Sequence, residues 1–143
     1  MTPDEVVVVE TRRWLRKVER DLLAVQAAMG FDPPLLDDAA YHCQQAVEKV
    51  FKAFLVWHGR SFRKTHVLAE TGMYCAEIDP SLLLIVERVR PMSDYSSAFR
   101  YPGERDEPTL QEAQRALTIA REVVAAVMDR IPLLPEALPP PES

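Results

Sequence analysis

The positions of proline and glycine constrain the fold of this chain more than any other feature. The 143 residues include twelve prolines and only four glycines, and the prolines lie at the edges of long apolar-periodic stretches. Proline starts or stops helices because it has no N–H donor and its ring clashes with the preceding turn. This placement is typical of helices joined by short connections.

Helical periodicity fills the stretches between these residues. Thr2, Pro3 and Glu5 form a capping-box pattern, and apolar residues then recur every three or four positions until Gly30. The same signs predict helices over roughly residues 4–29, 37–58, 66–77, 80–90 and 109–131, with a brief helical turn at 93–98. The second helix has the widest apolar arc, so we expect it at the centre. Strand signals are nearly absent, and the sequence predicts an all-α, up-and-down bundle of four to five helices.

The length corresponds to one domain, because single domains commonly have roughly 100–200 residues. We expect residues 1–131 to form the bundle and residues 132–143, with five prolines, to form a flexible tail. No apolar run reaches the roughly 18 residues of a membrane span, and the stretch 6–9 is too short for a signal peptide. These features predict a cytoplasmic protein. Cys43 and Cys75 fit no metal-binding spacing, so we expect two buried thiols, with no metal and no cofactor.

Charge is unevenly distributed along the chain. The net charge is −5, yet the stretch 49–66 contains five cations and no acid. From residue 104 to the end there are eight acids and four bases. A basic surface on an acidic body indicates a face that recognises anions.

Three places combine residues that could carry chemistry. Gln45, Glu48 and Lys52 share one helical stripe, which suits either a binding site or a solvated flank. The loop that contains Arg63, Lys64 and His66 precedes a helix start, where a phosphate is favoured, although a plain basic loop is equally compatible. The pair Arg100–Tyr101 could hold a phosphate and stack a base. Equally, the tyrosine could belong to the core and the arginine could pair with an acid of the bundle.

Several catalytic layouts are absent from the sequence. The four glycines are too dispersed to build a phosphate-binding loop, and no HExxH or GxSxG motif occurs. Catalysis would therefore depend on histidine, arginine, lysine and tyrosine, a set suited to RNA or phosphate esters without a metal.

Three motifs in this order resemble the HEPN family. They are AYHCQQAVEKVFKAFLVWHG at residues 40–59, KTHVL at 64–68 and AFRYPG at 98–103, and the likeness covers about residues 10–130. The resemblance implies a dimeric helical bundle that pairs with a minimal nucleotidyltransferase in a toxin–antitoxin-like system, or that binds RNA or a nucleotide. The site residues implied by the motifs are Gln45, Glu48, Lys49, Lys52, Lys64, His66, Arg100 and Tyr101.

One departure from the family pattern bears on catalysis. Ribonuclease members carry arginine, four to six residues and then histidine near the last helix, whereas Glu104, Arg105 and Asp106 stand where that histidine would follow Arg100. We therefore expect a homodimeric module that binds RNA or nucleotide phosphate. The alternatives are a metal-independent ribonuclease toxin, with His66 and Arg100 as catalytic candidates, and a purely structural interaction bundle.

Overall fold

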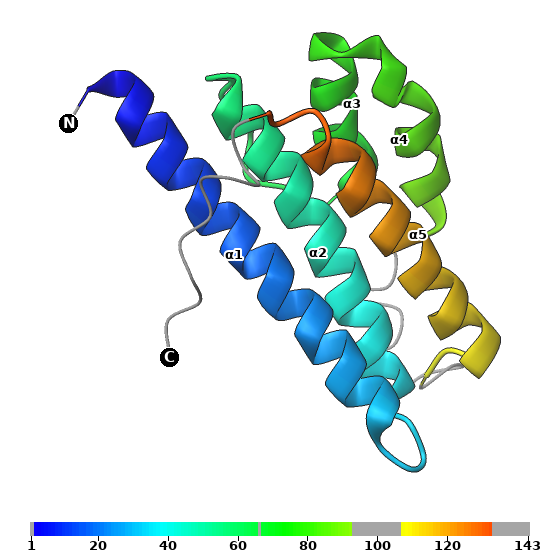
Figure 1. Ribbon diagram of the computed structural model, residues 1–143. Helices are drawn as coiled ribbons and strands as arrows, with labels where there is room; N and C mark the ends of the chain where they lie inside the picture. The colour runs from blue at the N-terminus through cyan, green and yellow to red at the C-terminus, as the bar shows by residue number, and fades with distance from the viewer. Residues whose placement is uncertain (1, 66, 93–106, 133–143) are drawn as a thin grey trace.

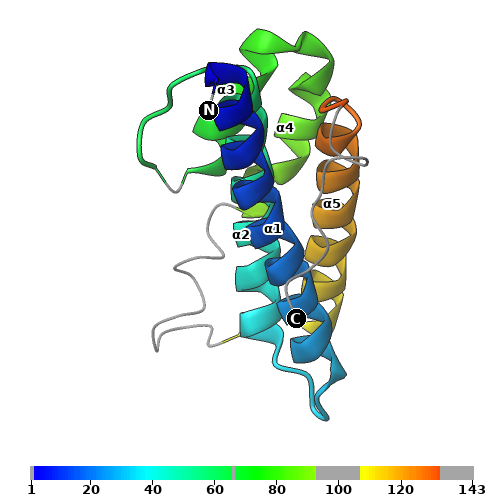
Figure 2. The same ribbon diagram turned by 60° about the vertical axis from the view of Figure 1, so that its left-hand side comes forward.

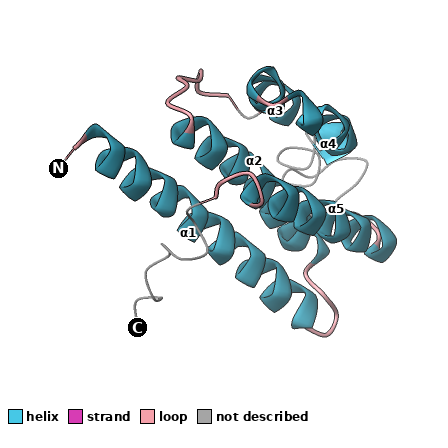
Figure 3. Cartoon of the chain, turned by 45° about the horizontal axis from the view of Figure 1, so that its top comes forward, coloured by secondary structure: helices cyan, strands magenta, loops and turns pink. Residues whose placement is uncertain are grey.

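The computed structural model describes residues 2–65, 67–92 and 107–132, and within these ranges the chain forms helices without strands (Figure 1). The elements are α1 (Pro3–Gly30), α2 (Leu36–Trp57), α3 (Leu68–Ile78), the 3-10 helix η1 (Pro80–Leu82), α4 (Leu83–Val89) and α5 (Leu110–Met128). Both α1 and α5 pack on α2, which lies between them (Figures 1 and 3). The predicted all-α bundle is confirmed.

Capping boxes begin both outer helices. At α1, the Thr2 hydroxyl accepts a hydrogen bond from the Glu5 N–H at 3.2 Å, and the Glu5 carboxylate accepts one from the Thr2 N–H at 3.3 Å. Thr109 and Glu112 repeat this arrangement at α5 with distances of 3.1 and 3.0 Å. These contacts satisfy N–H groups that have no partner within the helix, so the two starts occur where the sequence predicts them.

The core is built around α2, as its wide apolar arc predicts. Buried residues occur on nearly every side of this helix, including Cys43, Val47, Phe51 and Leu55. Gly59 has φ +67°, a left-handed conformation that ends the helical segment at low steric cost. Hence α2 contacts α1, α3 and α5 at the same time.

The short helices α3 and α4 gather at one end of the three long helices (Figure 2). Gly72 permits this close packing, because a Cβ atom there would lie 3.0 Å from the Val86 methyl groups and 3.1 Å from the Phe51 ring. The glycine that weakens α3 as a helix therefore allows α3 to approach α4 and α2.

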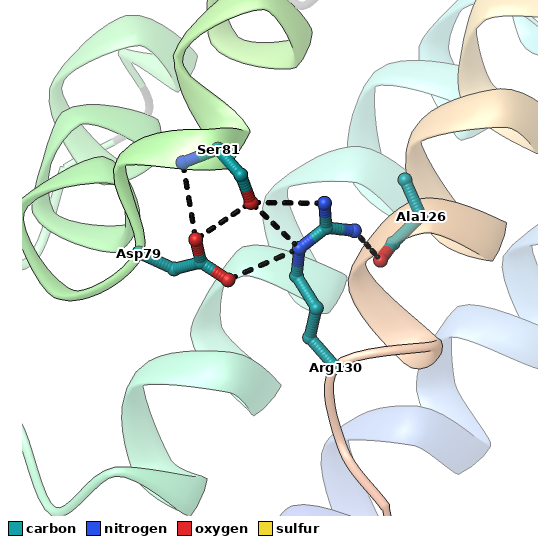
Figure 4. A network of polar contacts seen from close by, with 4 residues as sticks. All are labelled: Asp79, Ser81, Ala126 and Arg130. Atoms are coloured by element: carbon teal, nitrogen blue, oxygen red, sulfur yellow. Dashed lines mark hydrogen bonds and ion pairs between the residues drawn. The ribbon is translucent and has the colours of Figure 1, made fainter.

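A polar network links the start of η1 to the end of α5 (Figure 4). The Asp79 carboxylate accepts hydrogen bonds from the Ser81 N–H at 3.0 Å and the Ser81 hydroxyl at 2.6 Å, and these bonds lower the pKa of Asp79. Arg130 donates to Asp79 at 3.1 Å and to the Ala126 carbonyl at 2.6 Å. The network fixes the exit of the chain from α5.

The helix boundaries differ from the sequence prediction by a few residues. The stretch predicted as one helix over 80–90 is divided into η1 and α4, and α5 ends at Met128 with a turn up to Arg130 instead of continuing to residue 131. The predicted helical turn at 93–98 and the tail from residue 133 onward lie outside the described residues. Within the described part of the chain, no helix has the length and apolarity needed to cross a membrane.

Candidate functional site

A cluster of charged groups joins α1 to α2. The Asp21 carboxylate of α1 accepts a hydrogen bond from the Lys49 ammonium at 2.6 Å, and its other oxygen lies 2.8 Å from His42 Nδ1. His42 and Lys49 are seven residues apart on α2 and so face the same side of that helix. The side chain of Asp21 is only 8% exposed. A nearly buried carboxylate thus holds two α2 side chains in place.

Lys52 continues this polar line by one further turn of α2. Its side chain is 10% exposed, and its Nζ atom lies 3.8 Å from a Glu48 carboxylate oxygen. The Nζ atom also lies 5.5 Å from the centre of a Trp14 ring and 5.9 Å from that of Phe62. A lysine between two aromatic rings gains a cation–π contribution that offsets part of the cost of removing it from water.

Two glutamines complete the line. Gln45 Nε2 donates a hydrogen bond to Gln44 Oε1 at 3.0 Å. Gln44 is fully buried, and its own Nε2 has no hydrogen-bond partner. We name the set Asp21, His42, Gln44, Gln45, Glu48, Lys49 and Lys52 the polar seam.

The stripe predicted from the spacing of Gln45, Glu48 and Lys52 is confirmed, but its interpretation as a solvated flank is wrong. Glu48 is 3% exposed and Lys52 is 8% exposed as whole residues. The spacing places these side chains on one side of α2, and the packing of α1 and of Phe62 then covers that side.

The loop cations have carboxylate partners that the local sequence does not contain. Arg60 forms an ion pair with Glu77 at 2.8 Å, and Arg63 forms one with Glu70 at 3.0 Å. The hydrogen bond from Arg63 is the main cause of the lowered pKa of Glu70. The expectation that nothing neutralises the basic stretch is therefore wrong for these two arginines, and also for Lys49 and Lys52. Lys64 is exposed and has no ion-pair partner among the described residues.

Three expected site residues lie outside the described part of the chain: His66, Arg100 and Tyr101. The expectation that His66 approaches the Arg100–Tyr101 pair across the bundle therefore stays a prediction. The structure brings Gln45, Glu48, Lys49 and Lys52 together in the polar seam and places Arg63 and Lys64 in the adjoining loop.

The two cysteines are buried thiols, as the sequence predicts. Burial raises the pKa of Cys43 to about 12 and raises that of Cys75 as well. The Cys75 thiol also donates a weak hydrogen bond to the Phe51 carbonyl at 3.5 Å. The described residues contain no group of three or more histidine, cysteine or acidic side chains that could hold a metal ion.

Sequence reasoning missed Asp21 and His42 as members of the site. A signal for Asp21 was available, because it lies three residues after Val18 and four before Val25, both of which are in the apolar register of α1. An acid in an apolar register is expected to have a buried partner. The sequence contains no comparable signal for His42, whose role depends on the facing helix.

A second feature lies on the other side of α1, where a groove of about 380 Å³ runs between α1 and α5. Its apolar lining comes from Leu15, Val18, Leu22, Leu23, Val124 and Met128. Three polar residues, Glu19, Gln26 and Arg121, complete the lining. The groove contains none of the residues expected to bind RNA or nucleotide.

Comparison with known proteins agrees with this helical arrangement. The sequence profile of the HEPN domain matches residues 11–131, which include α2 with its polar seam and all of α5. The chain belongs to the HEPN domain family. It is also 28% identical over 131 residues to a Methanocaldococcus jannaschii protein named "Putative toxin MJ1304", and the match covers 81% of this chain and 84% of that protein. No solved structure gives a significant match.

Proposed function

We propose that this HEPN protein is a toxin–antitoxin-like module that binds RNA or a nucleotide through phosphate contacts in the loop 60–65. The observation that carries the proposal is the grouping of Arg60, Arg63 and Lys64 on one exposed loop, whose Phe62 ring has its centre 5.9 Å from Nζ of the buried Lys52. Lys64 has no ion-pair partner among the described residues, so its charge is available to a ligand.

The two arginine ion pairs of the loop are compatible with phosphate binding because they are exposed. The Arg63 side chain is 73% exposed, and the Arg60 side chain is 40% exposed. Exposed pairs of this kind contribute about 0–1 kcal/mol each. A phosphate group offers a stronger, bidentate partner for arginine, so exchanging Glu70 or Glu77 for phosphate has a small cost.

Phe62 adds a second element to the proposed site. This ring is half-buried and comes from the same loop, and the Lys52 ammonium lies near both it and the Trp14 ring. Aromatic side chains next to cations are the arrangement on which unpaired bases stack while their phosphates meet positive charge. The loop therefore favours a single-stranded RNA segment or a nucleotide over a duplex.

The test is a gel-shift titration of single-stranded RNA and of a nucleotide competitor at two salt concentrations. We expect wild-type binding that weakens with salt, and we expect Arg63→Ala/Lys64→Ala to bind at least about tenfold more weakly with a salt slope reduced by roughly one to two. Its thermal stability should change little, because both side chains are exposed.

A matched control removes two exposed arginines elsewhere, Arg88 of α4 and Arg115 of α5. Like Arg63, Arg88 pairs with an exposed carboxylate, that of Glu122. Arg88→Ala/Arg115→Ala should bind as the wild type does. Equal loss in both double variants would indicate a net-charge effect, and unchanged binding by Arg63→Ala/Lys64→Ala would contradict the proposed site.

One observation favours a second candidate, a metal-independent ribonuclease toxin. His42 Nδ1 is held by Asp21 at 2.8 Å, which fixes the orientation of the imidazole in the way that a general base requires. RNA cleavage in the presence of a chelator would support this candidate if His42→Ala abolished it. The control is His58→Ala, since His58 is exposed and contacts the Phe54 ring. RNA that stays intact with the wild-type protein would leave the binding module as the function.

Pairing with a nucleotidyltransferase is part of the same proposal and is supported by membership of the family. Expression of this chain with and without the product of its neighbouring gene tests it. We expect growth inhibition by the chain alone and relief by the neighbour if that neighbour is a minimal nucleotidyltransferase. Growth that is unaffected in both cultures would contradict the toxin–antitoxin assignment but not the RNA-binding one.

A further inference from the structure

We propose that Glu70 and Glu77 of α3 occupy, in the free protein, the positions that two phosphate groups of an RNA strand take when the strand binds to the loop 60–65. This inference rests on the proposed phosphate-binding role of that loop. It adds what holds the loop before binding and what kind of ligand releases it. The loop connects the end of α2 to the start of α3 (Figure 2). We name Glu70 and Glu77 the α3 acid pair.

Both members of the acid pair hold an arginine of the loop. The Arg60 guanidinium lies 2.8 Å from a Glu77 carboxylate oxygen, and the Arg63 guanidinium lies 3.0 Å from one of Glu70. Tyr74 lies between the two acids on α3. Its hydroxyl donates a hydrogen bond to Glu70 at 3.3 Å, and Arg60 lies 5.2 Å from the centre of its ring. Residues three and four positions apart share one face of a helix, so these three α3 side chains form a stripe along which the loop lies.

The loop runs antiparallel to α3 and is held at two points about two helical turns apart. Glu70 and Glu77 are seven positions apart, which corresponds to about 10.5 Å along the helix axis. Arg60 and Arg63 are three positions apart, and an extended chain covers about 10 Å over that length. The two lengths agree, so an extended loop segment can keep both arginines on their acids at the same time.

This spacing favours a ligand with at least two phosphates. The oxygens of one phosphate belong to a single tetrahedral group, so one phosphate can replace only one of two carboxylates that are two turns apart. A polynucleotide strand carries a phosphate at every nucleotide and can replace both carboxylates. Each replacement gives an arginine the charge-assisted, bidentate hydrogen bonds that it forms with phosphate. A strand, rather than a mononucleotide, therefore frees the whole loop from α3.

The acid pair also weakens binding, because each ion pair must break before a phosphate can take its place. The hydrogen bond from Arg63 is the main cause of the lowered pKa of Glu70, so this carboxylate is charged at neutral pH and competes with phosphate. Exposed ion pairs are weak, and breaking one lowers an affinity by at most about fivefold. The acids thus restrain the loop without preventing a strand from binding.

Neutralising the acid pair tests the proposal. Glutamine has the size of glutamate and removes only its charge, so Glu70→Gln/Glu77→Gln should free both arginines. Isothermal titration calorimetry should show that single-stranded oligouridylate binds the double variant about tenfold more tightly than the wild type, and each single variant about threefold more tightly. Uridine monophosphate should gain at most about threefold in the double variant, because one phosphate meets one arginine.

A second readout needs no RNA. Trypsin cleaves after arginine and lysine, and the loop contains Arg60, Arg63 and Lys64. Cleavage of a folded protein depends on how often the segment opens, so trypsin should cut the loop of the double variant at least about threefold faster than that of the wild type. Mass spectrometry identifies the fragments, and circular dichroism should show the same helix content in both proteins.

A matched control neutralises two acids that pair with exposed arginines elsewhere. Glu87 of α4 pairs with Arg90, and Glu122 of α5 pairs with Arg88. Glu87→Gln/Glu122→Gln changes the net charge by the same amount and should leave both the RNA affinity and the cleavage of the loop as in the wild type. Equal gains in affinity in the two double variants would show a net-charge effect and overturn the proposal.

The remaining outcomes separate this inference from the proposed function. If Arg63→Ala/Lys64→Ala weakens RNA binding but neutralising the acid pair changes neither affinity nor cleavage, the loop is the RNA site and this inference alone is wrong. If no variant binds RNA, the proposed function is wrong, and the ligand inferred here is wrong with it. A mononucleotide that gains as much as the strand from the double substitution would overturn the requirement for two phosphates.

Discussion

The two long faces of α1 pack against their neighbouring helices in different ways. Toward α2, the helix buries the charged Asp21 and places Trp14 against Lys52. Toward α5, it presents Leu15, Val18 and Leu22, and the space between the two helices remains a groove. One face has charged partners and is closed, and the other is apolar and open.

The two faces of α1 therefore have different roles: the charged face determines how α1 aligns with α2, and the apolar face supplies contact area without determining alignment. Apolar contacts are non-directional, so they specify the register of α1 against its neighbour less strictly than a buried ion pair does. The Asp21 carboxylate, by contrast, must meet Lys49 and His42 at one register of α1 against α2, because any shift leaves charge buried without a partner. We infer that the polar seam fixes the register of the two helices and that the apolar face remains available for association.

The largest expected effect comes from breaking the seam. Asp21→Ala leaves the Lys49 ammonium, whose side chain is 22% exposed, without its carboxylate partner. Loss of one partner from a largely buried ion pair costs about 3 kcal/mol of unfolding free energy. Chemical denaturation followed by circular dichroism measures it.

A second variant distinguishes the stability that the ion pair contributes from the cost of leaving one charge without its partner. Asp21→Leu/Lys49→Met removes both charges and should recover most of the lost stability, because apolar replacement of a buried pair is often neutral or stabilising. His42 is about one-third exposed and can direct its ring nitrogen to water. If Asp21→Ala cost less than about 1 kcal/mol, the seam would not determine the register of α1 on α2.

A smaller loss is expected on the apolar face. Leu15→Ala should cost about 2 kcal/mol, at the low end for buried leucine, because the side chain borders an open groove and its removal leaves no enclosed cavity. Leu55→Ala is the matched control: this leucine of α2 is fully buried, so its loss should exceed that of Leu15→Ala. Equal losses in the two variants would indicate that the groove is closed in solution.

The sequence predicts the elements of this fold well because their signals are local. Two helix starts are marked by capping boxes between residues three apart, Thr2 with Glu5 and Thr109 with Glu112. The end of α2 is marked by Gly59, which adopts a positive φ. Helical spacing likewise places Glu48 and Lys52 on one side of α2.

The candidate site could be predicted only in part, because its partners come from other helices. Lys49 finds Asp21 at a separation of 28 residues, and Arg60 finds Glu77 at a separation of 17. No spacing rule within a helix predicts such pairs. The charges between Lys49 and residue 66 in the sequence therefore suggest more unpaired positive charge than the structure has. Helical periodicity alone does not show that Lys52 is buried.

The smallest change in the unfolding free energy of the isolated chain is expected at Leu23. This position also gives the most direct test of the difference between the two faces of α1. Leu23→Gln should change the unfolding free energy of dilute protein by less than about 0.5 kcal/mol, because this side chain is 57% exposed in the single chain. At higher concentration the two proteins should diverge. Association stabilises the folded state by mass action, so the melting temperature of the wild type should rise with concentration, whereas that of Leu23→Gln should rise much less. A ligand at a hundred times its dissociation constant stabilises the folded state by about 2.7 kcal/mol. A hundredfold range of protein concentration should therefore change the melting temperature enough for differential scanning calorimetry to measure it. Parallel, flat melting temperatures for both proteins would show that the open face of α1 is not where copies of this chain meet.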